Sequence, residues 1–116
     1  MQTEIFYRDL TRTEALETYL LESVENEFLD FLKNDESARL TIRAETIRHR
    51  TQARKPMYAF EIILKPSHTK GVLKVLKQDN DFYIAVQKAT LAMKQMLRKR
   101  SGKFHNHHRK EFLKAA

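Results

Sequence analysis

Apolar and polar residues alternate along three segments in the middle of the chain, and a shorter segment near the start follows the same pattern. These segments are residues 38–47 (ARLTIRAETI), 57–65 (MYAFEIILK), 71–78 (GVLKVLKQ) and 3–9 (TEIFYRD). In the second of them, Phe60, Ile62 and Leu64 fall on one face of a strand, and Glu61 falls on the other. Period-two alternation is typical of a sheet with one buried face and one wetter face. The pattern therefore predicts four strands.

A longer segment, residues 10–34, repeats its apolar residues at the helical period instead. The stripe comprises Leu16, Leu20, Val24, Phe28 and Phe31, with Tyr19 and Leu32 beside them. Thr11 and Glu14 have the spacing of a capping box, in which side chains satisfy the unpaired amides at a helix start. We expect this helix to stop at Asn34 or Asp35.

A second helix is predicted in the last third of the chain. Its apolar stripe comprises Phe82, Val86, Ala89, Met93, Met96 and Leu97. Asp79, Asn80 or Asp81 can cap its start, where negative charge also favours the helix dipole. Gly102 stands where a helix C-cap is expected. We expect Tyr83 to pack in the core near the start of this helix.

The predicted element order is β-α-β-β-β-α. A helix between the first two strands predicts a parallel, right-handed crossover, and the short later connections predict an antiparallel meander. Because one face of the sheet is apolar, both helices should pack on it. The expected fold is a two-layer α+β domain with a four-stranded mixed sheet. It should span residues 1–103, and residues 104–116 should form a basic C-terminal tail.

Composition agrees with one soluble globular domain. The chain has 116 residues, of which 41% are hydrophobic and 32% charged. It contains no cysteine, which excludes disulfides, cysteine-bound zinc and thiol catalysis. The start, MQTEIFYRDL, lacks the features of a secretory signal, and no stretch has the roughly 18 apolar residues of a membrane span. We therefore expect a cytoplasmic protein.

The net charge of +7 is unevenly distributed. Residues 1–36 carry 3 bases and 10 acids, residues 37–81 carry 10 and 4, and residues 82–116 carry 9 and 1. A localised positive field concentrates and orients a polyanion. The distribution thus points to nucleic acid or an anionic membrane surface as a partner. The acidic residues 1–36 of one molecule can also pair with the basic residues 82–116 of another, so the chain can be a monomer or a homodimer.

Two groups of polar side chains are candidates for RNA contact. The last helix contributes Lys88, Lys94, Gln95, Arg98, Lys99, Arg100 and Lys103; the loop RHRTQARK contributes Arg48, Arg50, Arg54 and Lys55. Phosphate contacts of such side chains release counterions and make binding depend on salt. Arginine suits the loop because its planar fork pairs with phosphate and stacks on bases. The alternative is a solvated face whose terminal bases merely match the helix dipole.

Catalytic and metal-binding patterns are weak. The acids of the first helix are spaced for exposure to solvent, and a phosphate-binding glycine loop needs more than the two glycines present. His105, His107 and His108 lack a companion cysteine and a clear acidic ligand. We interpret them as part of a disordered polar tail, with RNA contact second and metal binding last. The sequence therefore predicts no enzyme, cofactor, metal or small-molecule substrate.

Two stretches, residues 13–16 (TEAL) and residues 81–99 (DFYIAVQKATLAMKQMLRK), resemble the ribosome hibernation-promoting factors, also called ribosome-associated inhibitor or sigma-54 modulation proteins. In that family an acid, a bulky apolar residue and a tyrosine open the last helix, as Asp81, Phe82 and Tyr83 do here. The resemblance in element order covers roughly residues 1–103. The chain is similar to the short, single-domain type.

The resemblance implies a fold like that of double-stranded RNA-binding domains. It also implies a non-enzymatic regulator that binds the small ribosomal subunit and its rRNA in the tRNA and mRNA channel and preserves idle ribosomes under stress. The first helix departs from the basic family pattern because it carries Glu14, Glu17, Glu22, Glu25, Glu27 and Asp30. First-helix contacts therefore do not transfer, and a divergent paralogue with altered docking is one interpretation that stays open. Alternatives are a generic module for structured RNA, or a protein or membrane interaction module that uses the basic amphipathic helix.

Overall fold

The computed structural model describes the backbone of residues 1–32, 35–47, 56–67 and 71–115, and side chains as far as residue 99 within these ranges. The elements, in chain order, are β1 (Gln2–Arg8), α1 (Glu14–Leu20), the π-helical turn η1 (Leu21–Glu25), α2 (Asn26–Leu29), β2 (Arg39–Ile47), β3 (Met57–Lys65), β4 (Leu73–Asp79) and α3 (Phe82–Ala115). The α+β architecture predicted from the alternating pattern is confirmed. The first predicted helix is divided into α1, η1 and α2.

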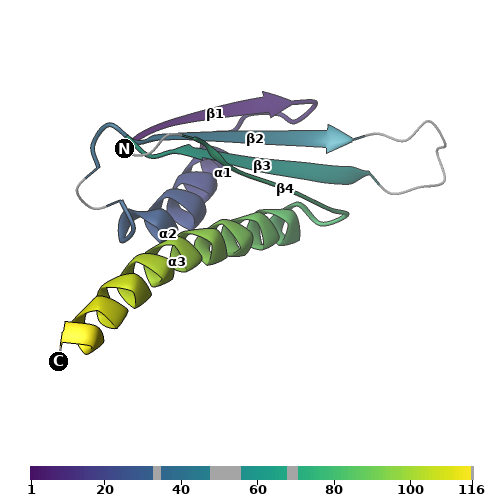
Figure 1. The fold of residues 1–116 in the computed structure, drawn as a ribbon. Helices are drawn as coiled ribbons and strands as arrows, with labels where there is room; N and C mark the ends of the chain where they lie inside the picture. The colour runs from purple at the N-terminus through teal and green to yellow at the C-terminus, as the bar shows by residue number, and fades with distance from the viewer. Residues whose placement is uncertain (33–34, 48–55, 68–70, 116) are drawn as a thin grey trace.

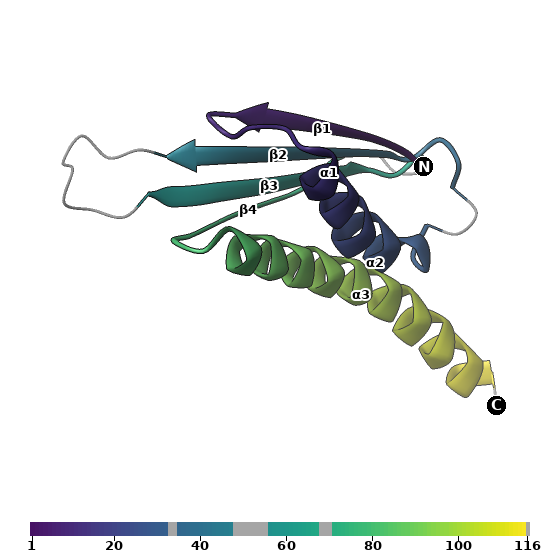
Figure 2. The ribbon, with the colours of Figure 1, turned by 180° about the vertical axis from the view of Figure 1, so that it is seen from behind.

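The four strands form one sheet in the order β1-β2-β3-β4. β1 and β2 are parallel, and the other neighbouring pairs are antiparallel. The register aligns Ile5, Ile42, Ile62 and Val75 in one row across all four strands. Figure 1 shows α1, α2 and α3 on the same side of this sheet, and the reverse view in Figure 2 agrees. The molecule therefore has two layers.

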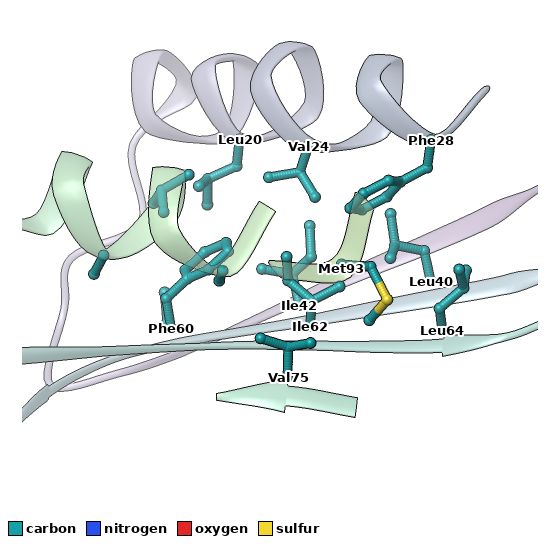
Figure 3. Packing of buried hydrophobic residues seen from close by; sticks show 14 of the residues in the cluster. Leu20, Val24, Phe28, Leu40, Ile42, Phe60, Ile62, Leu64, Val75 and Met93 are labelled. Carbon is teal, nitrogen blue, oxygen red and sulfur yellow. The ribbon is translucent and has the colours of Figure 1, made fainter. Parts of the chain in front are cut away.

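The hydrophobic core lies between the sheet and the helices. Its largest fully buried side chains are Phe28, Phe60, Leu20, Leu40, Ile42, Ile62, Leu64, Met93, Val24 and Val86. Figure 3 shows Leu20, Val24 and Phe28 pointing from the first helix toward the sheet. Burial of each such side chain contributes roughly 1.5–3 kcal/mol. Both predicted helical stripes and the inward faces of the strands are thus confirmed as the core.

The π turn η1 explains how the first helix keeps its stripe on the sheet. Leu16, Leu20, Val24 and Phe28 are spaced by four residues, and a step of four drifts by about 40° around an α-helix. The wider turn at Leu21–Glu25 rotates the chain in the opposite sense and offsets part of this drift. Leu20, Val24 and Phe28 are consequently all fully buried.

The ends of the first helix differ from the sequence prediction. Thr13, and not Thr11, is the N-cap, since its Oγ1 accepts a hydrogen bond of 3.1 Å from the backbone N–H of Leu16. The capping-box prediction was wrong because several hydroxyl residues stand near the helix start and the turn after β1 selects among them. α2 ends at Leu29, earlier than the predicted stop, and turns continue the chain toward β2.

Asp81 caps α3 among the three residues that the sequence offered. Its Oδ1 accepts a hydrogen bond of 2.9 Å from the backbone N–H of Tyr83, whereas Asp79 accepts one of 2.9 Å from the N–H of Asp81. α3 continues to Ala115, so the end predicted at Gly102 and the disordered tail are wrong. One glycine costs a helix only about 1 kcal/mol, and no proline follows to stop the helix. The division into a domain of residues 1–103 and a tail stays a prediction.

Candidate nucleic-acid interface

Two exposed basic side chains of α3, Arg98 and Lys99, lie in the part of the helix that leaves the core. Gln95, Arg98 and Lys99 are exposed, and Leu97 between them is the last buried residue of the stripe. Neither Arg98 nor Lys99 forms an ion pair with any side chain that the structure describes. Both cations are therefore available to an external anion.

Lys88 and Lys94 are in a different situation because each has an acidic partner. Lys88 Nζ donates to Asp79 Oδ2 at 2.6 Å, and this hydrogen bond lowers the pKa of the Asp79 carboxyl below its ordinary value. Lys94 Nζ donates to Glu27 Oε2 at 2.5 Å. The Lys94 pair joins the two helices, and only 23% of the lysine side chain is exposed. Either lysine has to leave its carboxylate before it can contact a phosphate.

Several candidates fall where the structure gives no side chain. Arg100 and Lys103 lie in the helical backbone of α3, and their side chains lie outside the described residues. Arg48, Arg50, Arg54 and Lys55 lie outside the described residues altogether. The structure therefore does not test their predicted role.

The strand ends that flank the loop segment and the basic C-terminal part of α3 lie toward opposite ends of the domain. The segment with the four basic loop residues connects the end of β2, at Ile47, with the start of β3, at Met57. Tyr58 is the second residue of β3 and therefore marks this end of the sheet. Tyr58 contacts Phe82, the first residue of α3, with ring centroids 5.8 Å apart. Arg98 lies about 24 Å further along the helix, at 1.5 Å a residue. Figure 3 correspondingly shows Met93 beside Leu40 and Leu64, toward the other end of the strands.

Three acidic residues of the first helix have partners: two form ion pairs, and one accepts a hydrogen bond from a hydroxyl. Glu17 pairs with Arg12 at 2.9 Å, and Glu25 accepts a hydrogen bond of 2.8 Å from Thr3 Oγ1. Glu27 holds Lys94. Exposed acids that have no such contact within the described residues include Glu14, Glu22 and Asp30. These exposed carboxylates oppose phosphate contact on the outer side of this helix.

A groove of about 390 Å³ separates the first helix from α3. Tyr19 and Ser23 line one side, and Thr90 and Leu91 line the other. The Lys94–Glu27 ion pair crosses the groove. The groove thus combines polar and apolar side chains with one cation and one anion.

Tyr83 does not pack in the core as predicted. Its side chain is 56% exposed, and its ring stands edge-on to that of Tyr19, with centroids 5.0 Å apart and an interplanar angle of 79°. Tyr83 directly follows Phe82 and therefore lies about 100° around the helix from the core-facing stripe. This spacing in the sequence already indicated an exposed position. The two tyrosines join the first helix to α3 at the start of α3, and more than half of Tyr83 is exposed to solvent.

Neither a group of metal ligands nor a membrane-spanning helix is found in the part of the chain that the structure describes. No three histidine, cysteine, aspartate or glutamate side chains in it converge on a possible metal position. In the same residues, no helix is both long and apolar enough to cross a membrane.

Comparison with known structures supports the fold. The N-terminal domain of Thermus thermophilus Protein Y superposes with a TM-score of 0.57 at 16% sequence identity, covering 85% of this chain and 98% of that one. A ribosomal subunit interface protein from Coxiella burnetii superposes with a TM-score of 0.61 at 13% identity, covering 88% and 99%. At such identities the likeness establishes a shared fold. A comparison with curated protein sequences gave no match.

The sequence profile of one family covers nearly the whole chain. That family is described as Sigma 54 modulation protein / S30EA ribosomal protein, and its profile matches residues 3–105. The match includes every strand, the first helix and most of α3. The resemblance noted from the opening of α3 is thereby confirmed, and the chain belongs to the Sigma 54 modulation protein / S30EA ribosomal protein family.

Proposed function

We propose that the protein binds the small ribosomal subunit in the cytoplasm, occupies its tRNA and mRNA channel through contacts to rRNA phosphates, and inactivates or preserves idle ribosomes under stress. The observation that carries this proposal is the family match over residues 3–105. The Coxiella burnetii structure with the same fold is named a ribosomal subunit interface protein. In this proposal the protein acts by occupying space and not by catalysis.

The proposed contact begins at the exposed end of α3. Arg98 and Lys99 present cations that are not neutralised by described neighbours, and Gln95 adds a polar group on the exposed surface. Arg100 and Lys103 continue this basic segment along the helix backbone. Cations that neutralise phosphates release condensed counterions, so their contribution falls as salt rises. We also propose a second contact by Arg48, Arg50, Arg54 and Lys55, which lie outside the described residues.

The acidic first helix constrains the docking pose. Its exposed carboxylates, among them Glu14, Glu22 and Asp30, repel phosphates. The proposed pose therefore turns the basic end of α3 toward rRNA and directs the outer side of the first helix away from it. Lys94 joins the interface only if it exchanges Glu27 for a phosphate.

A membrane-binding alternative conflicts with the packing of α3. A surface helix binds lipid through an exposed apolar side. Val86, Met93 and Leu97 instead face the sheet and are at most 5% exposed. Insertion of this side into a bilayer would open the core. RNA binding through the polar side leaves the core intact.

Sedimentation with purified subunits tests the proposal. The wild-type protein should travel with the small subunit and should be released as salt increases. Replacement of Arg98 and Lys99 by glutamate should weaken binding and reduce the slope of log K against log salt by about 2, since two phosphate contacts are lost. The matched control replaces Lys65 and Lys77, which are also exposed, and makes the same change in net charge.

The outcomes separate the candidate functions. Equal loss in the two double variants would show that net charge alone drives binding and would contradict an interface on α3. Binding to an unrelated duplex RNA that matches binding to the small subunit would favour a generic RNA-binding module. No association with the subunit at low salt would overturn the proposed function.

A further inference from the structure

The second face of the sheet is open in the described structure. Figures 1 and 2 show the helices on one side of the strands and none on the other. Two large apolar side chains on this open face are unusually exposed: Phe6 is 51% exposed and Leu76 is 52% exposed. A solvated sheet face carries mostly polar residues. Packing in the core therefore does not explain why apolar residues occupy these exposed positions.

The strand register arranges the open-face residues in rows that cross the whole sheet. One central row runs Phe6, Arg43, Glu61, Leu76 from β1 to β4. The next row runs Glu4, Thr41, Ile63, Lys74. In the first row, apolar residues occupy both ends and opposite charges occupy the middle. In the second row, opposite charges occupy the ends.

We propose that a second copy of the chain packs on this face, open face to open face, about a two-fold axis that runs parallel to the strands between β2 and β3. This operation places β1 over the second copy's β4 and keeps each row opposite itself. Phe6 then meets Leu76 of the second copy, and Glu4 meets Lys74. Each contact occurs twice because a two-fold interface is isologous.

The charges at the centre of the interface are also complementary. Arg43 lies opposite Glu61 of the second copy in this arrangement. Within one chain, Glu61 is already held by Arg43 at 4.0 Å and by Lys74 at 3.5 Å, and only 13% of its side chain is exposed. The carboxylate therefore stays paired when the face is covered, which a buried charge requires. A hollow of about 200 Å³ above Ala59 gives the facing side chains room to interdigitate.

The charge pattern discriminates between possible symmetries and occupants. A two-fold axis perpendicular to the strands would place Arg43 over Arg43 and Glu61 over Glu61, which is unfavourable. A nucleic acid on this face would meet basic residues, which are Arg8, Arg39, Arg43, Lys65 and Lys74, but also the carboxylates of Glu4, Glu45 and Glu61, and it would leave Leu76 without an apolar partner. A second copy supplies the opposite charges and the apolar partners together, so it is the occupant that the face fits.

The size of the face indicates a weak dimer. Four strands spaced about 4.8 Å apart and seven to nine residues long at about 3.3 Å a residue give a face of about 500 Å². Two copies would thus cover about 1,000 Å², which is at the lower limit for a specific interface. The row at the end of the strands places Arg39 opposite Lys65 of the second copy, and these like charges weaken the association further. We expect association that rises with protein concentration.

Sedimentation velocity over a range of protein concentrations, without ribosomes, measures this dimer independently of the proposed function. Leu76→Glu should weaken self-association at least tenfold, because it buries two unpaired carboxylates. Leu91→Glu is the matched control, since Leu91 is 54% exposed but belongs to the helical layer. Circular dichroism checks that both variants are folded. A wild-type protein that stays monomeric at millimolar concentration, or equal effects of the two variants, would overturn the proposal.

A charge exchange tests the predicted symmetry. Glu4→Lys should weaken the wild-type dimer, because Lys74 of the second copy then faces a like charge in place of a carboxylate. In a Lys74→Glu background the same substitution should strengthen the dimer, because opposite charges again face each other. The reversal of sign does not depend on any intramolecular cost of Lys74→Glu, since both proteins compared carry it. Weakening in both backgrounds would contradict this arrangement.

Discussion

At the scale of single residues, stability depends on a few side chains whose burial is complete. Phe28 and Phe60 are the largest of these, and they approach the core from the helical layer and from the sheet, respectively. The helical period of the sequence predicted Phe28, and the alternation predicted Phe60. The ion pair between Lys94 and Glu27 could not be predicted, because it joins residues 67 positions apart that only the packing of two helices brings together.

Phe28→Ala should lower the free energy of unfolding by about 3–5 kcal/mol, because it removes a fully buried ring and leaves a cavity. Urea denaturation measures the change. Leu29→Ala is the control on the next residue, whose side chain is 42% exposed, and it should cost less than about 0.5 kcal/mol. Similar costs at the two positions would contradict the observed orientation of the helix.

Thr13→Ala should lower the free energy of unfolding by about 1 kcal/mol through loss of the N-cap hydrogen bond to Leu16. Thr11→Ala, which alters an exposed threonine before the cap, should have almost no effect. The same urea experiment compares the two variants. A larger effect at Thr11 would restore the capping box that the sequence pattern suggested.

At the scale of elements, alternation located the strands well, and β3 has the same bounds as its predicted segment, 57–65. Helix ends were less predictable. Caps depend on which of several hydroxyl or carboxyl groups the preceding turn presents, and a lone glycine only modestly disfavours continuation. The π turn was also not foreseen, although the strict spacing of four in the first stripe is the pattern that requires it.

Gly102→Pro should end α3 before its last turns, because proline removes a backbone donor and clashes with the preceding turn. Far-UV circular dichroism should show a loss of helical signal at 222 nm, while the urea midpoint stays close to that of the wild type. Gly102→Ala is the control and should preserve or slightly increase the signal. An unchanged spectrum for Gly102→Pro would contradict a helix that continues to Ala115.

At the scale of the whole molecule, the charges are polarised between the acidic first helix and the basic end of α3. The sequence predicted this asymmetry and the basic character of the last helix. It did not predict that the strand ends flanking the loop segment lie toward the opposite end of the domain, since that follows from the direction of α3 across the sheet. Nor did it predict that Lys88 and Lys94 are held by carboxylates.

Glu27→Gln should strengthen binding to the small subunit several-fold, because it releases Lys94 and removes one negative charge. The slope of log K against log salt should become steeper by about 1 if the released lysine contacts a phosphate. Glu14→Gln removes the same charge from an exposed site on the same helix and serves as the control. Equal gains in the two variants would leave Lys94 outside the interface.

The continuation of α3 beyond Leu97 has a mechanical consequence. From Leu97, the last buried residue of the stripe, to Ala115 the helix extends about 27 Å at 1.5 Å a residue. A tilt of about 10° at the edge of the sheet would move the far end of such a lever by about 5 Å over this length. Small changes in the packing of Met93 and Leu97 would thus be amplified at the tip. The packing of the core therefore determines the direction of the end of α3 as well as the stability of the fold.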